Sequence, residues 1–164
     1  MIDLTVSGVI LEPRSQAPIV VLKDAEDRRA LLIWVGEFEA NAIAMALEHV
    51  KTPRPLSHDL MLNIATGLGA KLVEVRISAM REATFFAELE FEQDGQRQVV
   101  DARPSDAIAL ALRAGAPVKA AEDVMESSAV PISEAKEEEE TQQFRKFLEN
   151  VKPSDFGKFG GSSS

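Results

Sequence analysis

Residues 42–47 read AIAMAL and residues 107–112 read AIALAL, so the two stretches agree at five of six positions across an offset of 65 residues. In both halves a predicted β-hairpin precedes the helical stretch. Self-similarity at a fixed spacing indicates an internal duplication. We therefore predict that residues 17–50 and 82–115 are two copies of one strand–strand–helix unit.

Strand patterns surround the two helical stretches. Apolar runs with β-branched residues or period-2 alternation occur at residues 2–11, 19–22, 30–35, 71–79, 84–91 and 98–100. The dipeptide Asp94-Gly95 is a strong hairpin signal before the last of these runs. Two hairpin–helix units predict an α+β fold, with a largely antiparallel or mixed sheet and helices packed on it.

The helical spacing also predicts which side chains face the core. The first helix follows Gly36, and its apolar stripe is expected to contain Phe38, Ala42, Met45 and His49, with Ile43, Leu47 and Val50 beside it. A second helix, with Ser57 as its N-cap, is expected to turn four large side chains inward: Leu60, Met61, Ile64 and Leu68. The helix over residues 107–112 is expected to end at Gly115.

Composition limits the class of protein. The 164 residues include 18 basic and 27 acidic ones, a formal net charge of −9, and no cysteine. Disulfides, thiolate metal sites and cysteine nucleophiles are therefore excluded. Such a charge also places nucleic-acid binding at a disadvantage, because phosphate backbones repel it. No apolar stretch approaches the ~20 residues that span a bilayer, and residues 1–4 do not resemble a signal peptide, so we expect a soluble, cytoplasmic protein without membrane contact.

The acidic residues concentrate toward the C-terminus. Residues 1–130 are predicted to form one domain, residues 131–159 an acidic linker with a short helix, and residues 160–164 a flexible tail. The run at residues 134–140 (EAKEEEE) is typical of a solvated linker or the start of a helix. A regulatory tail that imitates nucleic acid is the alternative.

The first candidate site lies in residues 54–59 (RPLSHD), where a predicted helix begins. Arg54, His58 and Asp59 converge at a helix N-terminus, whose free N–H groups and positive dipole end suit an anion. The alternative is a capping role for Asp59, with His58 solvated. The other histidine, His49, lies at a helix end and is interpreted as a packed or capping residue.

The second candidate site is residues 101–106 (DARPSD). Asp101 and Asp106 could bind Mg²⁺ or Mn²⁺ through oxygen, with Glu39 of the first copy as a third ligand. Arg103 could hold a phosphate in a bidentate fashion, and Ser105 is a further candidate for substrate binding. The alternative is a structural Asp–Arg pair, with Asp106 stabilising the helix dipole.

The motifs at residues 34–36 (WVG), 54–60 (RPLSHDL) and 101–113 (DARPSDAIALALR) resemble the bifunctional nuclease domain family. The resemblance covers roughly residues 1–130. It implies a metal-assisted phosphodiesterase that hydrolyses DNA and RNA with little sequence preference. The family gives no secure catalytic assignment, so it marks positions without fixing their roles.

Two hypotheses follow for function. In the first, the chain is a nuclease: Asp101, Asp106 and Glu39 bind the divalent cation, His58 and Asp59 take part in catalysis, and Arg54 and Arg103 hold the phosphate. In the second, it is a non-catalytic binding or regulatory module and the same residues form fold-defining pairs. In either case, a small sheet with free edges favours a homodimer or a higher homo-oligomer.

Overall fold

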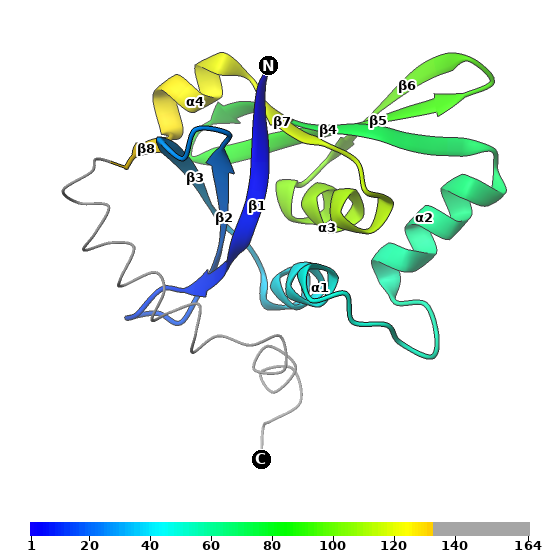
Figure 1. The fold of residues 1–164 in the computed structure, drawn as a ribbon, viewed down its shortest axis with the longest axis horizontal. Coiled ribbons are helices and arrows are strands. Elements are labelled where there is room, and N and C mark those ends of the chain that lie inside the picture. Colours follow the sequence, from blue (N-terminus) through cyan, green and yellow to red (C-terminus); the bar gives the residue numbers. More distant parts are fainter. Residues whose placement is uncertain (133–164) are drawn as a thin grey trace.

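The computed structural model describes residues 1–132; the predicted acidic run, C-terminal helix and tail lie outside the described residues. Within this range, eight strands form one sheet and four helices accompany it (Figure 1). The elements in chain order are β1 (Ile2–Leu11), β2 (Pro18–Asp24), β3 (Arg29–Trp34), α1 (Glu37–Leu47), α2 (Ser57–Gly67), β4 (Ala70–Arg81), β5 (Thr84–Gln93), β6 (Gln96–Ala102), α3 (Pro104–Ala114), β7 (Val118–Ala120), α4 (Glu122–Ser128) and β8 (Val130–Pro131). No helix among the described residues is long and apolar enough to cross a membrane.

The sheet has the strand order β6-β5-β4-β7-β1-β2-β3-β8. Every neighbouring pair is antiparallel except β4 and β7, which run parallel. Two three-stranded meanders, β1-β2-β3 and β4-β5-β6, therefore flank the short strand β7, and each meander is followed by a helix, α1 or α3. The predicted α+β class with a largely antiparallel sheet is confirmed.

The core lies between the sheet and the adjacent helices α1 and α3 (Figure 1). Both helices bury mainly alanine on their packed faces, around one isoleucine each, Ile43 and Ile108. Because alanine extends only one carbon from the backbone, the two helices approach each other and the sheet closely. Large side chains come mostly from the strands, for example Leu22, Leu31 and Ile77, which are fully buried.

The predicted apolar stripe of α1 is largely wrong. Ala42 is buried, but Phe38 is 79% exposed, Met45 is only partly buried and His49 is exposed. The packed face instead contains Ala40, Ala42, Ile43 and Ala44. The narrow space beside α3 admits small residues, so tertiary packing selects a different face from the one that large apolar residues indicate.

The prediction for α2 is wrong in the same way. Its four large side chains, Leu60, Met61, Ile64 and Leu68, are all exposed. The buried residue of this helix is His58. Ser57 is its first helical residue rather than its N-cap, a position that Leu56 occupies. A polar contact of His58, described below, fixes the rotation of α2 and turns the apolar stripe outward.

A residue in the left-handed conformation terminates each of the helices α1 and α3. As predicted, α3 stops at Gly115, which adopts the left-handed conformation with φ 68°. Helix α1 ends in the same conformation, but the left-handed residue is His49, with φ 54°. The N–H of His49 donates to Ala46 O and the N–H of Val50 donates to Met45 O, the two bonds of a Schellman motif. The backbone of His49 therefore caps α1, although its side chain is not packed.

We expect His49→Gly to stabilise the domain by about 0.5–1 kcal/mol, because glycine adopts the left-handed conformation without the steric cost of a Cβ. Thermal unfolding should show Tm rising by about 2–4 °C. The control His49→Ala removes the imidazole but keeps the Cβ, and should show no such gain. An equal Tm rise in both variants would contradict the explanation from backbone strain.

Candidate active site

The first turns of three helices meet at one cluster of polar side chains. Glu39 comes from α1, His58 from α2 and Asp106 from α3, while Arg103 is the N-cap residue of α3. We refer to these four residues as the Asp106 cluster. Helix N-termini carry partial positive charge, so the two carboxylates of the cluster lie where they are electrostatically favoured.

The carboxylate of Asp106 contacts both His58 and Arg103. Its Oδ1 lies 2.9 Å from Nε2 of His58, and its Oδ2 accepts hydrogen bonds from Nε and Nη2 of Arg103 at 3.0 and 2.8 Å. Nη2 of Arg103 also donates to Oε1 of Glu39 at 2.7 Å. The chain of contacts thus joins residues 39, 58, 103 and 106 into one network.

Arg103 is held but not buried. Its side chain is 66% exposed, whereas that of Glu39 is 18% exposed. Nη1 has no partner among the described residues, so one edge of the guanidinium faces outward. A guanidinium with a free N–H edge suits a phosphate oxygen.

The Glu39 side chain folds back against Gly36, the N-cap of α1. A Cβ at Gly36 would lie 2.5 Å from Oε2 of Glu39, closer than real contacts allow. The φ of Gly36 is −74°, so the backbone itself would accept other residues. Because the close atom is the end of a flexible side chain, a larger residue at position 36 would require only a shift of the Glu39 carboxylate.

His58 is nearly buried and has a defined orientation. Its side chain is 9% exposed and Nε2 contacts the Asp106 carboxylate. When the ring is neutral, the proton belongs on Nε2, because an ionised carboxylate can only accept. Nδ1 is then the acceptor nitrogen, and it has no partner among residues 1–132. A carboxylate that orients an imidazole, with the second ring nitrogen free, is the arrangement of a general base and its positioning residue.

Protonation within the cluster follows from these contacts. Burial disfavours the charged form of Asp106, but hydrogen bonds from His58 and Arg103 outweigh it, so the pKa of this carboxyl is lowered. Hydrogen bonds to Asp106 and Glu39 raise the pKa of the Arg103 guanidinium. Asp106 is therefore ionised and Arg103 is charged at neutral pH.

Asp59 makes its hydrogen bonds to residues outside the Asp106 cluster. Its Oδ2 accepts from the N–H of Leu56 at 3.0 Å, which caps the start of α2, and its Oδ1 accepts from Nε of Arg113 at 3.0 Å. His58 and Asp59 thus attach the first turn of α2 to opposite ends of α3. Both carboxylate oxygens of Asp59 are engaged, as the capping alternative predicts for this residue, but the solvated His58 of that alternative is wrong because the imidazole is buried against Asp106.

The other predicted site residues lie outside the network. Asp101 is exposed on the edge strand β6, Ser105 is buried in the first turn of α3, and Arg54 is exposed in the loop before α2. Among residues 1–132, no group of three or more His, Asp or Glu side chains is arranged to bind a metal ion. The predicted ligand set of Glu39, Asp101 and Asp106 is therefore not assembled in the described structure.

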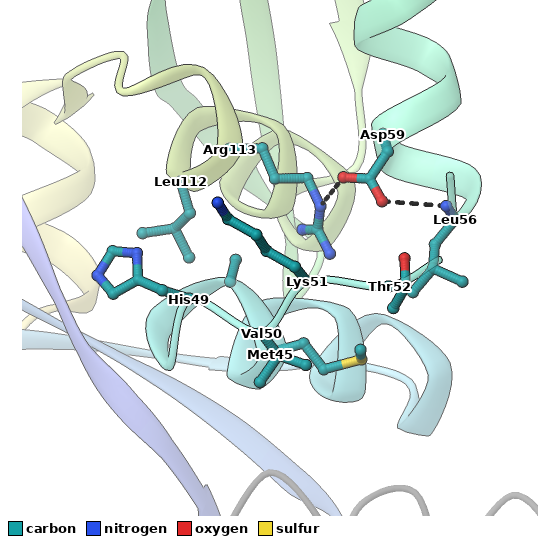
Figure 2. Close-up of a pocket in the computed structure, with 10 residues that line it drawn as sticks. Met45, His49, Val50, Lys51, Thr52, Leu56, Asp59, Leu112 and Arg113 are labelled. Carbon is teal, nitrogen blue, oxygen red and sulfur yellow. Dashed lines mark hydrogen bonds and ion pairs between the residues drawn. The ribbon is translucent and has the colours of Figure 1, made fainter. Parts of the chain in front are cut away.

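A pocket of about 320 Å³ lies at the other end of α1 and α3 (Figure 2). Lys51, Arg113 and Asp59 line it, above an apolar lining that includes Met45 and Leu112. Since the first turns of α1 and α3 share the Arg103–Glu39 contact and their last turns share this pocket, the two helices run in the same direction. Figure 2 shows Lys51 and Arg113 extending toward the same space.

Of the charged residues that line the pocket, the sequence motifs identified Asp59 as a site residue but not Lys51 or Arg113. Arg113 donates to Asp59 and also to the carbonyl of Ala109, one turn back in α3, and its positive charge in the last turn compensates the negative end of the helix. Lys51 forms no ion pair with another described residue. The position of Arg113, seven residues after Asp106 on the same helix, was the available signal, because that spacing places both on one face.

We predict that Asp106→Asn lowers the free energy of unfolding at pH 7 by about 1–3 kcal/mol, since hydrogen bonds to a charged group are lost. The folded-state pKa of Asp106 is lowered, so its stabilisation is present above the ordinary carboxyl value of 3.8 and disappears as pH falls through the lower folded value. Urea unfolding should therefore show the difference shrinking from pH 7 to pH 3. Asp101→Asn, the same change at an exposed residue, should stay within about 0.5 kcal/mol of wild type. A deficit independent of pH would contradict the assignment.

Comparisons with known proteins agree with this arrangement of motifs. The sequence profile described as the bifunctional nuclease domain matches residues 20–133. "Uncharacterized protein Rv1829" of Mycobacterium tuberculosis (strain H37Rv) is 38% identical over 162 residues, which cover 94% of this chain and 97% of that protein. "Bifunctional nuclease 1" of Oryza sativa subsp. indica is 29% identical over 117 residues, 67% of this chain and 35% of that longer protein. The chain therefore belongs to the bifunctional nuclease domain family.

Proposed function

We propose that the chain is a nuclease that hydrolyses phosphodiester bonds at the Asp106 cluster. The observation that carries the proposal is the combination of an imidazole oriented by a carboxylate with an exposed guanidinium held by the same carboxylate. Hydrolysis of a phosphodiester needs a group to remove a proton from water and a cation to hold the phosphate. His58 and Arg103 provide both within one network.

In the proposed reaction, Nδ1 of His58 accepts a proton from a water molecule. The water oxygen forms a bond to phosphorus, and the bond from phosphorus to the leaving sugar oxygen breaks. The leaving oxygen takes a proton from solvent, and the protonated imidazole returns its proton to solvent. Arg103 binds a non-bridging phosphate oxygen through its outward edge, and Asp106 keeps the imidazole in the required tautomer. Glu39 holds Arg103 in place and makes no contact with the substrate.

The family resemblance implies a divalent metal ion, but the described residues do not fit the predicted set of ligands for one. Asp106 and Glu39 already contact Arg103, and Asp101 lies on an exposed edge strand. No step of the proposed reaction is therefore assigned to Mg²⁺ or Mn²⁺. Parallel assays with Mg²⁺, with Mn²⁺ and with EDTA measure whether either cation is required.

The proposed substrates are DNA and RNA with little sequence preference. Three exposed cationic groups suit phosphates rather than base edges: Arg103 in the cluster, Arg54 in the loop before α2, and Lys51 in the pocket at the other end of α1 and α3. The Asp106 cluster carries two carboxylates against one guanidinium, and the chain has a net charge of −9, so we expect weak binding. We also propose self-association, whose surface is argued below.

One observation favours a second candidate function, a non-catalytic binding or regulatory module. Asp106, Asp59 and Glu39 each have an intramolecular cationic partner, as expected of pairs that define a fold. The two functions differ in what substitution does. Loss of a catalytic group lowers the rate and spares stability, whereas loss of a structural pair lowers stability.

We expect His58→Gln and Arg103→Gln each to reduce kcat on single-stranded DNA and on RNA by about 10²–10⁴-fold, since each removes a catalytic group. Fluorescent oligonucleotide cleavage measures the rate, and thermal unfolding of the same preparations separates activity from stability. Arg14→Gln, in the loop between β1 and β2, is the matched control and should cleave at the wild-type rate. Equal rates in wild type and both site variants would refute the proposed site.

We also expect Lys51→Glu to raise KM for oligonucleotides several-fold with little change in kcat, because the pocket would hold the neighbouring part of the strand rather than the reacting phosphate. The effect should shrink as salt is raised. Arg14→Glu makes the same change in net charge away from the pocket and should leave KM unaltered. An equal rise in KM for both variants would show that net charge, and not the pocket, is responsible.

A further inference from the structure

Helix α2 presents one apolar stripe to solvent. Leu60, Ile64 and Leu68 follow one another at four-residue spacing and are 51%, 54% and 69% exposed, with Met61 beside them. The opposite side of the helix makes the contacts with α3 and β4. Monomeric soluble proteins rarely expose contiguous apolar patches larger than a few hundred Å², so a stripe along a whole helix marks an interaction surface.

The C-terminal end of the stripe lies beside the hairpin that forms one edge of the sheet. Gln93, at the end of β5, donates from Nε2 to Leu68 O at 2.8 Å, so the β5–β6 hairpin adjoins the C-terminal end of α2. Strand β6 is the edge of the sheet, and its residues Val99 and Val100 are exposed. Figure 1 shows α2 and the β5–β6 hairpin at the same end of the molecule. An edge strand without cover and an adjoining apolar helix both require a partner.

We propose that a second copy of this chain docks on the α2 stripe, about a two-fold axis that places α2 against its counterpart. The inference rests on the self-association proposed above and not on nuclease activity. Residues spaced by four form a ridge that packs into the grooves of an identical helix, so the stripe is self-complementary. Residues 57–67 contain one acidic and no Lys or Arg residue, so the like net charge of two copies is least repulsive at this surface.

Two other occupants fit the structure less well. The described chain ends beside β8, where the N–H of Ile132 donates to Arg28 O. That strand is at the opposite edge of the sheet from β6, so the last described residue, Ile132, lies at the far edge from β6. An anionic lipid surface attracts amphipathic helices through Lys and Arg, and α2 has neither. An interface of about 800 Å² per partner is typical of a stable dimer, so both α2 and the β6 edge are expected to take part in it.

Cysteine scanning tests the proposal directly, because the full chain contains no cysteine. We expect the single variant Ile64→Cys to form a disulfide-linked dimer rapidly under mild oxidation. Thr66→Cys, an exposed residue on another side of the same helix, should crosslink at least ten-fold more slowly. Sedimentation of the wild type should show a dimer at micromolar concentration.

A charge in the stripe should separate the copies. Ile64→Lys and Leu68→Glu are each expected to weaken dimerisation at least 100-fold in sedimentation equilibrium, with Thr66→Lys as the matched control. Because these side chains are exposed in the single chain, thermal unfolding should remain cooperative. A monomeric wild type would overturn self-association, and a dimer unaffected by both charged variants would overturn the α2 surface. Nuclease activity, assayed separately, decides neither outcome.

Discussion

The close contact between α1 and α3 is the constraint on which the rest of the molecule depends. Alanine faces on both helices allow their backbones to approach over the sheet. Because the helices lie side by side in the same direction, their first turns bring Glu39 to Arg103, and their last turns enclose the pocket beside Lys51. A larger residue on either face would separate the helices and disturb both ends together.

Asp106 joins structure to proposed chemistry. It holds Arg103 at the start of α3 and fixes the orientation of His58, and through His58 it sets the rotation of α2. The apolar stripe of α2 faces outward as a result. A single carboxylate therefore determines both the geometry of the candidate active site and the surface proposed for self-association, although the two lie on different sides of α2.

The sequence predicted the fold class, six of the eight described strands to within a few residues and the two motifs that meet in the Asp106 cluster, because hydrophobic period and turn residues are local signals. It missed the short strands β7 and β8, which are too brief to show a pattern. It failed on the packed faces of α1 and α2. Large apolar residues such as Phe38 and Ile64 are a good indicator of a buried face only when the space beside the helix can hold them. It also grouped Asp101 with Glu39 and Asp106 as metal ligands, whereas Glu39 and Asp106 both contact Arg103 and Asp101 lies outside the cluster. Which of several candidate polar side chains share one network depends on tertiary packing, which one sequence does not display.

The short strand β7 has a consequence for how the chain folds. It lies between the two meanders, yet residues 118–120 come after both of them in the chain. Each meander is built from neighbouring segments and can form early, since its loop-closure entropy is small. The hydrogen-bonded ladders that join the two meanders form only once β7 is present. During synthesis, the two halves of the sheet would therefore keep unpaired edge strands until residues 118–120 leave the ribosome. Pairing of β7 with both meanders is then the step that joins two local structures into one domain.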